Sequence, residues 1–129
     1  CSVAADESIT IAVDAGRECG CRIVCDLIAH PDVAGRAAEI EALGVDSVYV
    51  HWGSDQKSLN ARRDPQLDLR AVVDRVKIPV GVATFSVEDG VRAVKQGAQV
   101  LVVGMPLIAE PDPEAALREY VEAVRAAWR

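Results

Sequence analysis

The chain has 129 residues, the length of one ordinary domain; half are hydrophobic and 26% are charged, as in globular proteins. Its net charge of −6 argues against nucleic-acid binding, because neutralising phosphates requires clustered lysine and arginine. No apolar run approaches the length of a membrane span and no basic-then-apolar leader is visible, so we expect a cytoplasmic protein without a membrane partner.

Along the chain, the hydrophobic pattern alternates between helices and apolar strands. The first element is a helix, and four strands follow, each with a helix after it. The helices are expected at residues 6–18, 31–44, 65–75, 87–97 and 112–128, and the strands at 21–28, 46–51, 78–84 and 99–104. Capping residues support the last two helices, because Ser86 precedes one, and Asp112 with Pro113 at the first helical position begins the other.

The strands are apolar at nearly every position, which is typical of parallel sheets covered by helices on both faces. The segments "EALGVDSVYVH" and "VKQGAQVLVVG" are near copies, and this internal repeat indicates tandem βα units. No linker interrupts the chain, so residues 1–129 are expected to form a single α/β domain. Two architectures fit: an open doubly wound sheet, or part of a (β/α)8 barrel, which normally needs about 200 residues or more. In both, function lies at the carboxyl ends of the strands.

Three of the four cysteines lie in the short run "CGCRIVC". Neither a Cys-x-x-Cys pair nor a nearby histidine accompanies them, which argues against a zinc site. Cys19, Cys21 and Cys25 share one parity, so on a strand they would line one face. We expect these three and Cys1 to be reduced thiols packed as small hydrophobic residues.

Polar and small residues mark the four predicted strand ends. They are Asp26, His51 with Asp55, Ala83 with Thr84, and Gly104 with Met105. Each also has a structural interpretation: Asp26 could cap a turn, a single histidine at a strand end is often structural, and Gly104 suits any tight βα turn.

The order of these features resembles a known family. The run "RIVCDLIAHPDVAGRAAEIEALGVDSVYVHWGSD", followed by "IPVGVATFSVEDGVRAVKQGAQVLVVGMPLIAEPDPEAALREYVEAV", is similar to the 3-hexulose-6-phosphate synthases. These enzymes stand beside the 3-keto-L-gulonate-6-phosphate decarboxylases in the orotidine-5′-monophosphate decarboxylase superfamily. The resemblance covers essentially the whole chain. It implies the C-terminal half of a TIM-type (β/α)8 barrel, with about four βα units preceded by one helix.

The resemblance also implies an aldehyde-lyase activity, the Mg²⁺-dependent condensation of formaldehyde with ribulose 5-phosphate through an enediolate. His51 would be the acid/base at the reacting carbon, and Asp55 would orient His51 or bond the pocket. Substrate-binding residues would be Asp26 and, for the phosphate, the backbone at Ala83, Thr84, Gly104 and Met105.

Several departures from the family pattern bear on these expectations. Ala83–Thr84 replaces the usual Gly-Gly pair, with the Thr84 hydroxyl in partial compensation, and Gly104–Met105 is followed by Pro106, which has no N–H. Ser54 stands where the decarboxylases have arginine, which disfavours that alternative activity.

The family's Asp-x-Lys-x-x-Asp motif is absent, so we expect no metal ligands in this chain. A half barrel also has open sheet edges, so we expect a homodimer, a complement to a missing N-terminal half barrel, or a piece of a longer protein, which Cys1 in place of Met favours. A non-catalytic phosphosugar-binding half barrel is the alternative function. A receiver-like domain is disfavoured because "GMPL" lacks a lysine.

Overall fold

The computed structural model describes residues 1–28, 30–53, 64 and 66–128. Every predicted helix and strand is present, and a short 3-10 helix after the last strand was not predicted. The elements are α1 (Asp6–Cys19), β1 (Val24–Asp26), α2 (Val33–Ala42), β2 (Ser47–Val50), α4 (Leu67–Arg75), β3 (Val80–Thr84), α5 (Val87–Lys95), β4 (Val100–Val103), η1 (Leu107–Ala109) and α6 (Pro113–Ala127).

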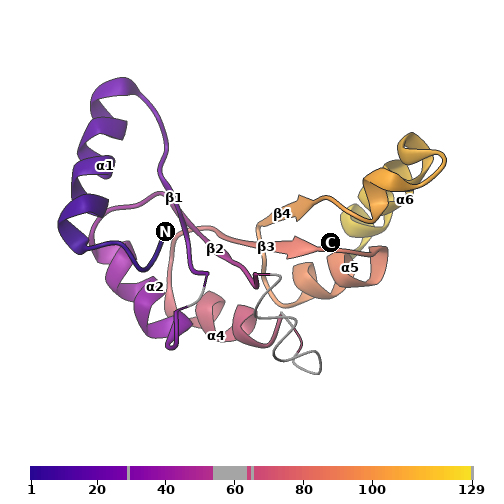
Figure 1. Ribbon diagram of the computed structural model, residues 1–129. Helices are drawn as coiled ribbons and strands as arrows, with labels where there is room; N and C mark the ends of the chain where they lie inside the picture. The colour runs from indigo at the N-terminus through magenta and orange to yellow at the C-terminus, as the bar shows by residue number, and fades with distance from the viewer. Residues whose placement is uncertain (29, 54–63, 65, 129) are drawn as a thin grey trace.

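The four strands form one parallel sheet in the order β1-β2-β3-β4. This order decides between the two architectures. A doubly wound sheet reverses its strand order at a switch point, whereas here each new strand adds to the same edge, as around a barrel. Figure 1 shows α2, α4 and α5 along one face of this curved sheet. The fold is α/β, and its architecture is that of half a TIM-type barrel.

The main hydrophobic core lies between the sheet and these helices. Alternate residues of the two central strands point into it, and the sheet contributes Val48, Val50, Val80 and Val82, each at most 2% exposed. They pack against Ile40 of α2 and other fully buried helix residues. Burying one such side chain is worth about 1.5–3 kcal/mol, so this layer supplies most of the driving force for folding.

The opposite face of the sheet is open in the described part of the chain. Val24, Val100 and Val102 point to this side and are 61%, 45% and 47% exposed. A hollow of about 410 Å³ lies over them. The prediction that the strands are buried on both faces is therefore wrong for this concave face, which in a closed barrel lines the interior.

The amino-terminal strand is shorter than predicted. Gly20 adopts a left-handed conformation (φ 69°) and ends α1, and the N–H of Cys21 donates to the Gly16 carbonyl at 2.8 Å. Cys19 is therefore helical, and Cys21 precedes the strand. All four cysteines are free thiols, but only Cys25 is buried, so the prediction of packed thiols is wrong for the other three.

The predicted caps are confirmed. The Ser86 hydroxyl accepts from the N–H of Asp89 at 3.1 Å, and the Asp112 carboxylate accepts from the N–H of Ala115 at 3.0 Å.

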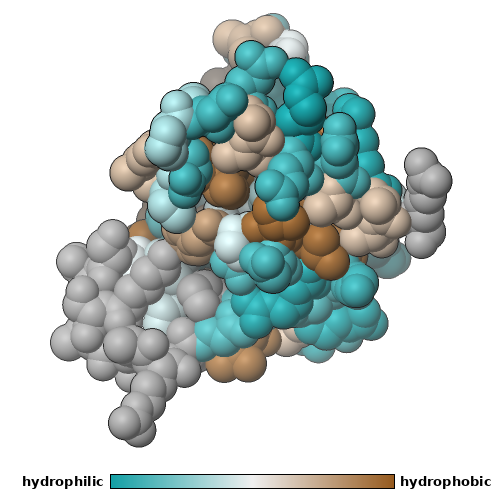
Figure 2. Space-filling model, turned by 90° about the vertical axis from the view of Figure 1, so that its right-hand side faces the viewer, coloured by the Kyte–Doolittle hydropathy of each residue, from teal (hydrophilic) through white to brown (hydrophobic). Residues whose placement is uncertain are grey.

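Beyond β4, Leu107, Tyr120 and Val124 form a second, smaller core cluster. Figure 2 shows that the side of the molecule that carries α6 is mainly hydrophilic, with hydrophobic surface near its centre. Among the described residues, none of the helices has the length and apolar character needed to cross a membrane.

Candidate active site

His51 and Asp26 meet at the carboxyl ends of β2 and β1. The Nδ1 atom of His51 lies 2.7 Å from Oδ2 of Asp26, and the other Asp26 oxygen accepts the N–H of Ile28 at 2.8 Å. A carboxylate accepts hydrogen bonds, so in the neutral ring Nδ1 carries the hydrogen and Nε2 keeps a free lone pair. The pair thus presents Nε2 as a proton acceptor while Asp26 holds the ring in place.

The orienting role that the sequence suggested for Asp55 is performed by Asp26 in the described part of the site. Asp55 itself lies outside the described residues. Parallel pairing explains the meeting of the two side chains, since Asp26 is opposite Tyr49 in the register and His51 follows two residues later on the same face. Both side chains remain accessible to a substrate, because His51 is 34% and Asp26 35% exposed.

Tyr49 is a member of the site that the sequence reasoning missed. Its ring centroid lies 5.4 Å from that of His51, with an interplanar angle of 49°. Burial, and then the charge of Asp26, raise the pKa of the Tyr49 phenol above its ordinary value, so it stays protonated at neutral pH. Gly81 leaves room for the ring, because a Cβ there would lie 3.2 Å from a ring carbon of Tyr49. The strand period of two in "SVYVH" could have identified Tyr49, since it places Tyr49 on the same face of the strand as His51.

The hollow on the concave face adjoins this pair. Its lining is largely apolar, with Asp26, Ser47 and Tyr49 as its polar members. The remaining lining residues are Val24, Val48, Gly81, Val100 and Val102. In a closed barrel such a space is filled by side chains of the remaining strands, so only its Asp26 end adjoins the strand-end site.

The end of β3 differs from the expectation in one respect. Thr84 is 1% exposed, and its hydroxyl lies 2.6 Å from the Tyr120 hydroxyl of α6. The hydroxyl is therefore engaged by the helix layer, which gives no support to the prediction that it compensates for a missing glycine. Thr84 has the parity of Val82, which faces the helices, while the partly buried Ala83 faces the other side. In the turn that follows, the N–H of Phe85 lies 3.4 Å from Oδ2 of Asp89.

The end of β4 is open. A Cβ added to Gly104 would meet no atom within 4 Å, and Met105 is 62% exposed. The bond between Met105 and Pro106 is cis, and Pro106 supplies no N–H. The buried Leu107 of η1 then anchors the connection to α6. Among the described residues of this strand end, the groups that could bond a phosphate are backbone groups near Gly104 and Met105.

The described residues do not fit the Mg²⁺ site that the resemblance implies. Among residues 1–28, 30–53, 64 and 66–128, no group of three or more histidine, cysteine or acidic side chains is arranged to hold a metal ion. Both oxygens of Asp26 are already engaged, by His51 and by the N–H of Ile28. Mg²⁺ requires an octahedral set of oxygen ligands, which Asp26 alone does not provide.

Comparisons with known proteins agree with the fold described above. The 3-hexulose-6-phosphate synthase of Mycobacterium gastri is 33% identical over 128 residues, which cover 92% of this chain and 57% of that protein. 3-Hexulose-6-phosphate synthase 3 of Staphylococcus saprophyticus is 30% identical over 128 residues, covering 95% and 58%. The crystal structure of the Salmonella typhimurium 3-hexulose-6-phosphate synthase matches with a TM-score of 0.87 and 26% identity, over 98% of this chain and 60% of that one.

A second crystal structure of a 3-hexulose-6-phosphate synthase matches with a TM-score of 0.79 and 33% identity, over 99% of this chain and 59% of the other. The chain thus spans less than two thirds of the length of these relatives. The model of the orotidine 5′-phosphate decarboxylase / HUMPS family matches residues 1–120. The chain belongs to the orotidine 5′-phosphate decarboxylase / HUMPS family.

Proposed function

We propose that the protein containing this chain is a lyase of the 3-hexulose-6-phosphate synthase type, which joins formaldehyde to ribulose 5-phosphate in an aldol reaction. The observation that carries the proposal is the His51–Asp26 pair, at 2.7 Å on the strand ends of a chain whose relatives are 3-hexulose-6-phosphate synthases. An aldol reaction requires removal of a proton beside a carbonyl and its later return to an oxygen. A positioned imidazole performs both transfers.

In this mechanism Nε2 of His51 is the atom that exchanges the proton. It takes a proton at the reacting carbon of the pentulose, and the electron pair of that C–H bond moves into an enediol(ate). The nucleophilic carbon then attacks formaldehyde, and a proton is returned to the new hydroxyl. Asp26 keeps Nε2 free in the resting ring and stabilises the imidazolium that forms. Asp55 is proposed as a further hydrogen-bonding group of the pocket.

The substrate phosphate is proposed to bind at the neighbouring strand ends. The backbone at Ala83 and Thr84, and at Gly104 and Met105, is the candidate cradle, as at the last two strands of many barrels. The turn after β3 leads directly into α5, whose N-terminal N–H groups add a positive dipole. The side chains Asp26, Tyr49 and His51 would then contact the reacting end of the sugar.

The open concave face belongs to the same proposal. Its exposed valines indicate that further strands cover it in the working protein, either a complementary half barrel or a second copy in a homodimer. The metal that the family implies would need ligands beyond those described here. Action in the cytoplasm is part of this proposal.

The test is an assay of the full-length protein with ribulose 5-phosphate and formaldehyde. His51→Ala is expected to lower kcat by about 10²–10⁴-fold, the usual contribution of a general acid/base. His30→Ala is the matched control, because it removes the other imidazole of the chain, whose Nδ1 lies 2.8 Å from the backbone carbonyl of Asp32. Equal activity of both variants would refute the role of His51.

Two further assays of the full-length protein distinguish the synthase from the two alternative functions. Release of CO₂ from 3-keto-L-gulonate 6-phosphate, without condensation, would replace the synthase with the decarboxylase. Binding of ribulose 5-phosphate by the full-length protein without turnover of either substrate would support a non-catalytic phosphosugar-binding protein.

A further inference from the structure

Tyr49 lies one step below His51 on the concave face of the sheet. The strand register places it in a row with Asp26, Gly81 and Val100, one residue from each strand. Alternate residues of a strand share a face, so the next step toward the carboxyl end of β2 carries His51. A side chain in this row therefore lies between the strand-end site and the interior of the barrel.

The Tyr49 ring contacts the His51 ring from this lower side. The two ring centroids are 5.4 Å apart, with an interplanar angle of 49°. Aromatic pairs in contact have centroids about 4.5–7 Å apart, so the rings touch and leave no space between them for a substrate atom. A substrate group beside the imidazole that extends toward the barrel interior therefore meets the Tyr49 ring.

Gly81 gives the ring its place on the neighbouring strand. A Cβ at Gly81 would lie 3.2 Å from Cδ2 of Tyr49 and 3.3 Å from Cβ of Val100. Both distances are shorter than ordinary van der Waals contact, so these two side chains already occupy the space beside Gly81. The Tyr49 ring thus extends from β2 over β3 and covers the sheet beneath the site.

Packing of the barrel interior by Tyr49 is compatible with a role in substrate selection. Protein interiors are close-packed, so the volume that a side chain fills is closed to a ligand. Tyr49, Asp26 and Gly81 line the hollow of about 410 Å³ on the concave face. Even where further strands fill that hollow, a smaller side chain at position 49 would open the volume of the ring itself beside His51.

We propose that Tyr49 is a specificity-determining residue that limits the aldehyde substrate to formaldehyde. This inference rests on the proposed function and deepens it. The aldehyde carbon must lie about 3–3.5 Å from the nucleophilic carbon, which in the proposed mechanism lies beside Nε2 of His51. Formaldehyde carries only hydrogen on its carbonyl carbon. A larger aldehyde adds a carbon substituent, and the Tyr49 ring closes the space that this substituent would enter.

The experiment compares kcat/KM for acetaldehyde and for formaldehyde, each with ribulose 5-phosphate, in the full-length protein. The intrinsic reactivities of the two aldehydes cancel when the acetaldehyde-to-formaldehyde ratio of a variant is divided by that of the parent. Tyr49→Ala should raise this ratio about tenfold or more, because one carbon atom in a pocket is worth about 10–200-fold in discrimination. Tyr49→Leu should give a smaller rise, and Tyr49→Phe, which keeps the ring, should retain the parent ratio.

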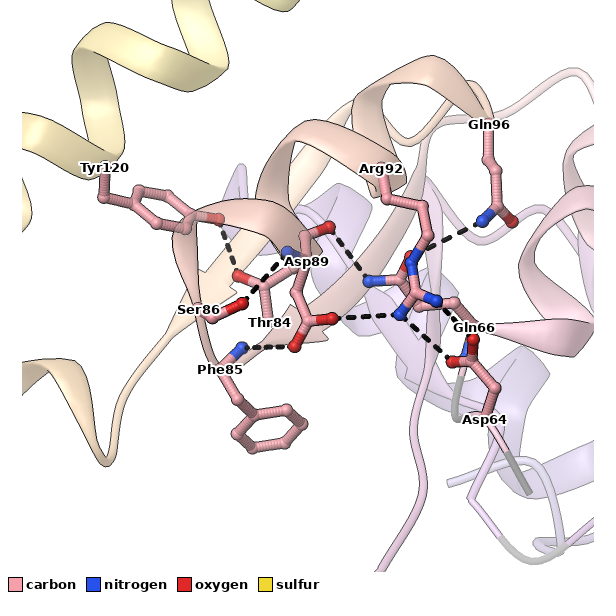
Figure 3. Close-up of polar contacts among 9 residues, drawn as sticks. All are labelled: Asp64, Gln66, Thr84, Phe85, Ser86, Asp89, Arg92, Gln96 and Tyr120. Carbon is pink, nitrogen blue, oxygen red and sulfur yellow. Dashed lines mark hydrogen bonds and ion pairs between the residues drawn. The ribbon is translucent and has the colours of Figure 1, made fainter. Parts of the chain in front are cut away.

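Tyr120 provides the matched control, because it is the other tyrosine of the chain and also lies against a glycine. A Cβ at Gly90 would lie 2.7 Å from atoms of its phenol. Figure 3 shows the Tyr120 hydroxyl beside that of Thr84, in the helix layer behind the sheet. Tyr120→Leu removes a buried phenol without opening the concave face, so it should leave the aldehyde ratio unchanged.

A second substitution at Gly81 tests the location of the opened space. Gly81→Ala in the Tyr49→Leu background returns a methyl group close to the position vacated by Cδ2 of the ring. This methyl group should lower the acetaldehyde-to-formaldehyde ratio again, toward that of the parent. A ratio that Gly81→Ala leaves as high as in Tyr49→Leu alone would place the gain elsewhere in the protein and contradict the inference.

The outcomes separate this inference from the proposed function. Absence of condensation with either aldehyde in the parent protein would refute the proposed reaction and the inference together. Condensation with the same aldehyde ratio in the parent, Tyr49→Leu and Tyr49→Ala would overturn the inference alone. An equal rise in Tyr120→Leu or in Tyr49→Phe would also overturn it, by assigning the effect to general loosening or to the hydroxyl. Circular dichroism checks folding, and Tyr49→Leu decides the matter if Tyr49→Ala does not fold.

Discussion

The two halves of the sheet present their strand ends in different ways. At β1 and β2 the side chains face the concave side, where His51, Asp26 and Tyr49 contact one another. At β3 the side chain at the strand end points away, and Thr84 is bonded to Tyr120 in the helix layer. The β1–β2 half presents polar side chains at its strand ends. The β3 end presents backbone instead, because the Thr84 side chain is bonded to Tyr120 in the helix layer. In the proposed function, proton transfer is assigned to the β1–β2 half and anion binding to the β3–β4 half.

The largest expected effect tests the side-chain half. Asp26→Asn keeps the size of the residue but replaces the acceptor oxygen with an amide that can also donate. The ring can then adopt the wrong tautomer, and the imidazolium loses its counter-charge, so we expect kcat to fall by about 10²–10⁴-fold, as when the aspartate of a catalytic triad is replaced. Steady-state kinetics on the full-length protein measures this change. Unchanged kcat would mean that Asp26 only caps the turn through the N–H of Ile28.

The next effect tests how the backbone half is supported. A Cβ at Gly90 of α5 would lie 2.7 Å from three atoms of the Tyr120 phenol. Gly90→Ala is expected to destabilise the fold by about 1–3 kcal/mol through overpacking, partly offset by the better helix propensity of alanine. Urea unfolding measures this difference.

Gly104→Ala is the matched control, because a Cβ there meets nothing within 4 Å. Its stability should equal that of the parent, while its affinity for phosphate reports whether the backbone at Gly104 is approached by a ligand. Equal stability of all three proteins would show that Tyr120 moves aside at no cost.

A smaller effect tests the bond between Thr84 and Tyr120 directly. Thr84→Val is nearly isosteric and removes the partner of a buried phenol, which should cost about 1–3 kcal/mol. We expect the free energy of unfolding to fall while the KM for ribulose 5-phosphate stays the same. A raised KM at unchanged stability would instead show that the Thr84 hydroxyl contacts the phosphate, as the sequence alone had suggested.

How much of the fold and of the candidate site the sequence predicts also differs from one part of the sheet to another. The helix caps and the parallel arrangement of the strands were predictable, because Ser86 and Asp112 carry local signals and buried strands carry a strong apolar pattern. The bounds of β1 and the choice between the two strand orders were not predictable from the pattern alone. The sequence also placed candidate site residues at the strand ends, but it did not predict the contact between His51 and Asp26. The partner of His51 is distant in sequence, since Asp26 reaches it through the register of β1 and β2, whereas Asp55 was the nearby candidate.

Two departures of the structure from expectation have a common physical origin. The role of the Thr84 hydroxyl and the burial of both sheet faces were judged from residue types without the parity of each strand. In β3, Val80 and Val82 place Thr84 with the helices, and in β4 Val100 and Val102 point to the open side. Apolar runs do not reveal which face is covered, because valine suits both.

The smallest expected effect is a pH dependence that distinguishes the two tyrosines. Burial raises the pKa of both the Tyr49 and the Tyr120 phenol; the charge of Asp26 adds to it for Tyr49, whereas for Tyr120 the bond to Thr84 lowers the pKa and the charge of Asp89 raises it. A group whose pKa is raised on folding contributes stability that is fully present below its unfolded pKa, about 10, and is lost as the pH rises through the folded value. The free energy of unfolding should therefore decline above about pH 10, and Tyr49→Phe should reduce this decline.

Asp26→Asn sharpens the test, because it removes the charge beside Tyr49 and leaves Tyr120 untouched. The Tyr49 pKa should move down toward its ordinary value in this variant, while the Tyr120 pKa, raised mainly by burial, should stay the same. Ultraviolet titration of Asp26→Asn in Tyr49→Phe and Tyr120→Phe backgrounds separates the two phenols. Equal shifts of both would mean that Asp26 acts on the whole sheet, and the distinction between a side-chain half and a backbone half would not hold.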